Sequence, residues 1–338
     1  MSVTKVKKTL NLLIKFAIVI ASYGYLYVQI GNRNTLSEGY RIFRASIGSG
    51  SFIAGLCAVV ILMLVNWALE ACKWKYLIRK IESVTFFSAF KAVWAGITVS
   101  TFTPNRIGEL FGRSFILKKA SLWEGTFATI TGSLGQLLVT LVAGSFATLF
   151  FMEAHPGFIL NMSRPWFTSL IFLTVLLNAL AIFFFFNIHI LTPLLGRLFK
   201  KRFIRMQQHI KVFASYSGKE LGVVILLSGA RYLVFSLQFF MLFRLFSVPI
   251  PLVDSFIVTA VIYFIMAAIP TVALSELGVR GSLAIATTAA WSGSSMSDAL
   301  TAGAGSAAAF IWLINLVIPA LVGSIFVFRL RFFRKNES

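Results

Sequence analysis

Long apolar runs alternate with short polar stretches along the chain and predict membrane-spanning helices. A helix needs about 20 mostly apolar residues to cross the hydrocarbon core of a bilayer. Six runs meet this length: residues 10–30, 51–69, 123–151, 166–186, 221–246 and 299–328. The last run contains Pro319, which we expect to kink its helix.

Two further apolar stretches are shorter and are broken by proline. Residues 86–102 run into Pro104, and residues 255–269 run into Pro270, after which a second apolar piece follows at 282–291. Irregular backbone at membrane depth is tolerated only where protein or a wet cavity covers it. The pattern therefore predicts a re-entrant helical hairpin around each proline, added to about six full spans.

Composition agrees with an all-α polytopic membrane protein. The chain is 58% hydrophobic and 12% charged, whereas a soluble domain is about 45–50% apolar and about 25% charged. So much apolar surface cannot be hidden in one water-soluble core, and lipid must cover it. We expect residues 1–338 to form a single integral membrane domain.

The net charge of +20 indicates membrane orientation and not nucleic-acid binding, because the basic residues lie between the apolar runs. They concentrate in the N-terminal segment and in residues 73–91, 197–219 and 329–335. These four segments are predicted to be cytoplasmic, with both termini inside. The first apolar run is predicted to be a retained helix and not a cleaved signal. Residues 187–220 form a basic, amphipathic connector suited to an anionic membrane surface, or else a solvated linker.

The two broken segments carry related motifs. Glu109 follows Pro104 and precedes Arg113 by four residues, and Glu276 follows Pro270 and precedes Arg280 by four. Three spans separate the motifs, and an odd number flips the second unit relative to the first. Inverted repeats with discontinuous helices are typical of transporters. Residues 51–151 are therefore the expected first repeat unit, and residues 221–328 the second, inverted unit.

The motif residues suit an anionic headgroup. Glycine lets the backbone approach a ligand closely, arginine offers a fork that matches phosphate, and a carboxylate can orient the arginine or carry a proton. The candidate substrate-binding residues are Pro104, Arg106, Gly108, Glu109, Arg113, Arg231, Glu276, Gly278 and Arg280. The alternative is that both motifs are structural turns with internal ion pairs.

Arginine at the centre of a span is costly and requires a partner or a cavity. Arg231 lies in such a position and is expected to pair with Glu109 or Glu276, or to bind substrate. By the four-residue spacing, Glu109 is expected to pair with Arg113 or Arg231, and Glu276 with Arg280. The three histidines and two cysteines show no metal-ligand spacing and no disulfide framework. The sequence thus predicts no metal and no cofactor.

At these motifs the chain resembles the membrane region of lysylphosphatidylglycerol synthase/flippases and its stand-alone relatives. Residues 104–109 read Pro-Asn-Arg-Ile-Gly-Glu, and residues 278–280 read Gly-Val-Arg. The resemblance implies a bacterial cytoplasmic-membrane protein that handles an anionic, aminoacylated or polyprenyl-linked lipid. Two departures from the family pattern are Gly281, where relatives commonly have Glu, and residues 133–137, where relatives often carry an acid–Arg pair.

Three functions follow as alternatives. A lipid translocase needs a central cavity, and an integral-membrane transferase needs Glu109 or Glu276 as a base beside a headgroup pocket. A non-catalytic partner of a separate lipid synthase needs neither and has a closed centre. We expect a translocase and not an enzyme, because the chain ends eight residues after Leu330 without the soluble aminoacyl-transferase domain of the full-length synthases. The expected partners are a membrane lipid, and a separate synthase or a second copy of the chain, with no nucleic acid.

Overall fold

A computed structural model describes residues 43–101, 103, 107–156, 163–190, 211–212, 215–269, 273–293 and 298–328, with residues 13, 16, 20 and 41. The described residues form helices and no strands, which confirms the all-α membrane fold. Five helices are long and apolar enough to cross a membrane: α3 (Gly50–Ile78), α6 (Leu122–Ala154), α7 (Arg164–Phe186), α10 (Gly218–Leu245) and a composite helix over Asp298–Val327. The predicted span at residues 10–30 lies outside the described residues, apart from residues 13, 16 and 20.

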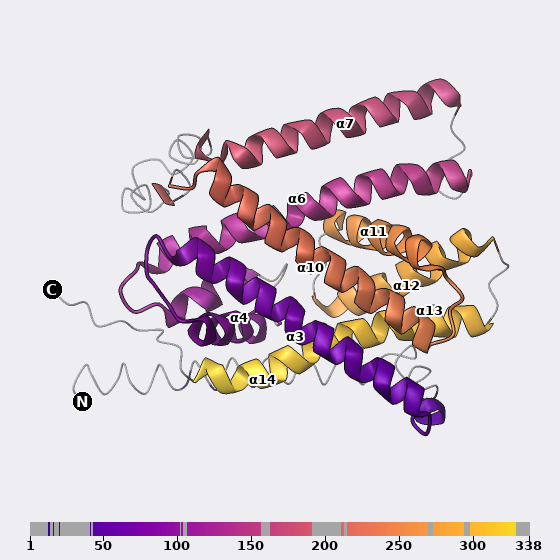
Figure 1. Cartoon of the computed structure of the whole chain (residues 1–338), viewed down its shortest axis with the longest axis horizontal. Coiled ribbons are helices and arrows are strands. Elements are labelled where there is room, and N and C mark those ends of the chain that lie inside the picture. Colours follow the sequence, from indigo (N-terminus) through magenta and orange to yellow (C-terminus); the bar gives the residue numbers. More distant parts are fainter. Residues whose placement is uncertain are drawn as a thin grey trace.

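Shorter helices follow α3 and α10. The first group is α4 (Phe86–Ser100), α5 (Ile107–Gly112) and the 3-10 turn η2 (Arg113–Ile116), and the second is α11 (Leu252–Ala268) and α12 (Ala273–Ser292). In each group the break between two helices falls where the sequence has its proline, between α4 and α5 and between α11 and α12. Figure 1 shows the two groups toward opposite ends of the long helices, with α4 on the left and α11 and α12 on the right.

Helix α3 is longer than its hydropathy predicts. The apolar run ends at residue 69, but the helix continues to Ile78. Lys73, which was expected in a basic segment between two spans, is therefore part of α3, and its side chain is 1% exposed. Residues four and then three apart lie on one helical face, so Asn66, Glu70 and Lys73 present a polar stripe to the interior.

Local sequence fixes several helix ends. Ser121 with Glu124 begins α6, and Ser217 with Glu220 begins α10, each as a capping box in which both backbone donors are satisfied. Glu220 also binds Arg79 at 3.0 Å and Lys80 at 2.6 Å. These contacts tie the end of α3 to the start of α10.

The C-terminal span is irregular near its proline. It consists of α13 (Asp298–Trp312), a π-helical turn η4 (Leu313–Val317) and α14 (Ile318–Val327). Proline lacks a backbone donor and its ring crowds the carbonyl four residues earlier. The expected distortion near Pro319 therefore takes the form of a wider turn immediately before it.

Helices α4 and α14 approach each other closely. A Cβ atom added at Gly323 would lie 2.2 Å from the Trp94 carbonyl oxygen and 2.6 Å from Thr98 Oγ1. The same threonine donates a hydrogen bond to the Ala320 carbonyl at 2.8 Å. Only glycine at position 323 permits this spacing.

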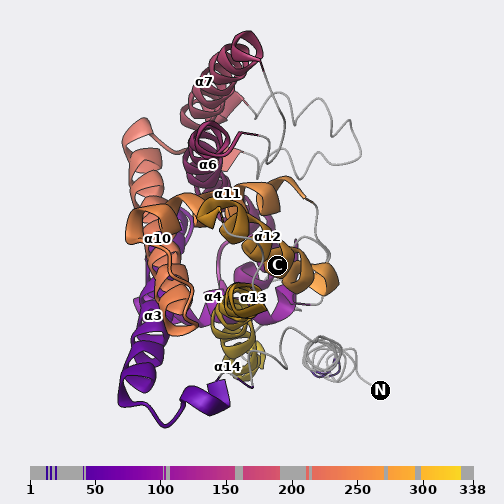
Figure 2. The ribbon, with the colours of Figure 1, turned by 90° about the vertical axis from the view of Figure 1, so that its right-hand side faces the viewer.

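Helix α7 lies at the edge of the bundle beside α6, as Figure 2 shows. Asn178 donates to Ser145 on α6 at 2.9 Å, whereas residues such as Trp166 and Phe172 are 69% and 70% exposed. A short 3-10 turn, η3 (Ile188–Ile190), follows. Most of the predicted connector at 187–220 lies outside the described residues.

Candidate functional site

A cavity of about 650 Å³ lies among helices from both halves of the chain. Helices α3, α6 and α10 line it together with both short-helix groups and the C-terminal span. Its charged and amide-bearing lining residues are Glu70, Lys73, Glu109, Arg113, Gln136, Arg231, Glu276, Arg280 and Asn315. The two predicted motifs therefore contribute to one cavity, as a central substrate site requires.

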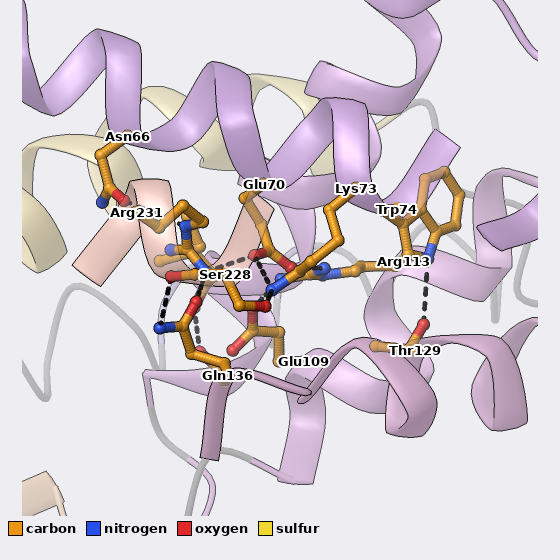
Figure 3. A network of polar contacts seen from close by, with 12 residues as sticks. Asn66, Glu70, Lys73, Trp74, Glu109, Arg113, Thr129, Gln136, Ser228 and Arg231 are labelled. Atoms are coloured by element: carbon orange, nitrogen blue, oxygen red, sulfur yellow. Dashed lines mark hydrogen bonds and ion pairs between the residues drawn. The ribbon is translucent and has the colours of Figure 1, made fainter. Parts of the chain in front are cut away.

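Glu70 is the hub of a buried ion network (Figure 3). Its carboxylate accepts from Arg113 Nη1 at 2.5 Å and from Lys73 Nζ at 2.9 Å, and it also pairs with Arg231. Exposed fractions of these four residues are between 1% and 6%. Charges so far from water require partners, and one carboxylate serves three cations here.

Neutral groups complete the surroundings of Arg231. Its Nε donates to Asn66 Oδ1 at 3.0 Å, and its Nη1 donates to Gln136 Oε1 at 3.2 Å. The Gln136 amide in turn donates to the Ser228 carbonyl at 3.3 Å, and the guanidinium carbon lies 5.3 Å from the centroid of the Trp67 ring. Arg231, which is part of α10, is therefore held by side chains of α3 and α6.

Both motifs form the ion pairs that their spacing predicts. Glu109 pairs with Arg113, and Glu276 pairs with Arg280 at 2.6 Å, each across one helical turn. Arg231, which was expected to pair with Glu109 or Glu276 or to bind substrate, pairs with Glu70. The Glu109 side chain is 21% exposed and that of Glu276 is 7% exposed. Glu109 is thus the more accessible acid of the two motifs.

The two candidate glycines, Gly108 and Gly278, differ in their surroundings. A Cβ added at Gly108 would lie 2.5 Å from the Val99 carbonyl oxygen, so this glycine serves the packing of α5 on α4. Gly278 is half-buried, and neither glycine lines the cavity. Pro104 and Arg106 lie outside the described residues.

Sequence reasoning missed Glu70, Lys73, Asn66 and Gln136. The first three share one face of α3 at four- and three-residue spacing, which becomes visible only if the helix is extended beyond its apolar run. Gln136 lies on α6, and its side-chain amide oxygen accepts a hydrogen bond from Arg231.

The described lining residues carry a positive excess, with four cations against three carboxylates. All three carboxylates are ion-paired. No group of His, Cys, Asp and Glu suited to a metal ion occurs among the described residues. An anion is the ligand that would balance this cavity.

Residues 13–323 match the model of the family described as the lysylphosphatidylglycerol synthase TM region. The match covers nearly the whole chain, and the protein belongs to this family of lipid-related membrane domains. No curated protein and no solved structure matches the chain.

Proposed function

We propose that this protein is a lipid translocase of the bacterial cytoplasmic membrane, with both termini inside. Its substrate is an anionic, aminoacylated or polyprenyl-linked lipid whose phosphate enters the central cavity. The observation that supports the proposal is the positive excess among the described lining residues of a cavity to which both motifs contribute. Units 51–151 and 221–328 act as inverted repeats around it, which is supported by the order of one long helix followed by shorter ones in each.

The alternatives have less support. A transferase needs a carboxylate free to act as a base, but Glu109 and Glu276 are each paired with an arginine. A docking partner of a separate synthase needs no cavity, whereas the centre of this molecule contains one of about 650 Å³. A cavity whose described lining includes four cations and three carboxylates is better suited to a charged headgroup in transit.

Replacing Arg280 by Gln is expected to slow translocation of phosphatidylglycerol about tenfold or more, since a hydrogen bond to a charged group contributes about 1.5–3 kcal/mol. The measurement is the rate at which a fluorescent phosphatidylglycerol in proteoliposomes becomes accessible to a membrane-impermeant quencher. Arg244→Gln is the matched control, because Arg244 is an exposed arginine on α10 that lies outside the cavity. Equal rates for wild type and Arg280→Gln, with both proteins folded, would contradict the proposal.

A further inference from the structure

A second, apolar groove adjoins the charged cavity. Its volume is about 220 Å³, and it lies between α6 and α7, ending at η3. Its lining is hydrocarbon throughout: Leu134, Leu137, Leu138, Leu141, Ala181, Phe184, Phe185 and Ile188. Neither the charge network nor the two motifs contribute a residue to it.

Leu137 lines both spaces. On α6 the cavity is lined by residues 133, 136, 137 and 140, and the groove by residues 134, 137, 138 and 141. Consecutive residues of a helix are about 100° apart, so these are two neighbouring stripes of one helix that meet at Leu137. The cavity and the groove therefore lie next to each other on α6, with Leu137, which is 40% exposed, between them.

The lining changes across this boundary, from a cavity that combines charged and apolar side chains to a groove lined by apolar side chains alone. Gln136 faces the cavity and binds Arg231, and the adjacent Leu137 begins the hydrocarbon surface. A phospholipid has the same sequence of groups, because a charged phosphate is joined through glycerol to acyl chains.

We propose that the groove between α6 and α7 is the binding site for an acyl chain of the lipid whose phosphate lies in the central cavity. This inference rests on the proposed function and adds the position of the acyl chain of the lipid. Arg113 and Arg231 hold the phosphate, and Leu137 lies at the glycerol region. The acyl chain extends along Leu138 and Leu141 toward Phe184. The groove thereby selects lipids with a long chain, and a free headgroup lacks this contact.

The test uses photo-crosslinking with the intact protein in vesicles of phosphatidylethanolamine and phosphatidylglycerol. Two probes carry a diazirine on one acyl chain: a phosphatidylglycerol, and a diacylglycerol that lacks the phosphate. Labelled residues are identified by peptide mass spectrometry. The reference is the opposite face of α7, where Phe172 and Leu176 are 70% and 43% exposed and lie outside the groove.

The phosphatidylglycerol probe should label Leu138, Leu141 and Phe184 about tenfold more, relative to the reference face, than diacylglycerol does. Arg113→Gln should reduce this preference by a similar factor, the affinity change expected on loss of one hydrogen bond to a charged group. Equal groove labelling by both probes in wild type would mean that bulk acyl chains fill the groove, and would overturn the inference.

A second pair of variants does not depend on the ion network. Leu137→Trp fills the boundary and should slow translocation of long-chain phosphatidylglycerol, while Leu176→Trp on the reference face should not. If the Leu137→Trp variant translocates phosphatidylglycerol at the wild-type rate, the acyl chain does not use the groove. This failure is separate from that of the proposed function, which falls only if translocation survives Arg280→Gln.

Discussion

Replacing Glu70 by Gln should destabilise the protein by about 3–5 kcal/mol, the cost of removing one partner from a buried ion pair. Glutamine keeps the shape of the side chain but leaves Lys73, Arg113 and Arg231 without their shared carboxylate. Thermal unfolding of the detergent-solubilised protein, followed by circular dichroism, measures the effect.

Glu109→Gln is the matched control for this experiment. It also removes a carboxylate beside Arg113, but that arginine keeps Glu70 at 2.5 Å, and the Glu109 side chain is 21% exposed. We therefore expect a clearly smaller loss of stability. If the two variants unfold at the same temperature, Glu70 is not the hub of the network.

Replacing Gly323 by Ala should lower the free energy of unfolding by about 1–3 kcal/mol, as overpacking of a tight contact does. The new methyl group would meet the Trp94 carbonyl oxygen at 2.2 Å, so α14 must move away from α4 and weaken the hydrogen bond from Thr98 to Ala320. The measurement is again thermal unfolding in detergent.

Gly229→Ala provides the contrast within the same chain. A Cβ atom at Gly229 meets nothing within 4 Å, and alanine is favoured over glycine in a helix interior by about 0.8–1.0 kcal/mol in water. This variant should be neutral or slightly more stable than wild type. Equal destabilisation of both variants would contradict the prediction, because helix propensity favours alanine at both positions and the α4–α14 contact would then not explain the loss at Gly323.

The fold class and the ion pairs within each motif could be predicted because their signals are local. Apolar runs mark the spans, and a four-residue spacing places Glu276 beside Arg280. The end of α3 could not be predicted in this way, because Glu70 and Lys73 count against insertion when each is taken alone. Their partners Arg113 and Arg231 lie 43 and 161 residues from Glu70, and nothing near Glu70 in the sequence indicates them.

The same separations have a consequence for synthesis of the protein. When α3 leaves the ribosome, Glu70 already has a partner, since Lys73 is one helical turn away and forms its own contact at 2.9 Å. The Glu70–Lys73 pair can therefore enter the bilayer without net charge. Arg231 emerges 161 residues after Glu70, so its helix can be delivered to a site where the carboxylate is already in place. The order of the network along the chain thus allows each buried charge to meet a counter-charge on arrival.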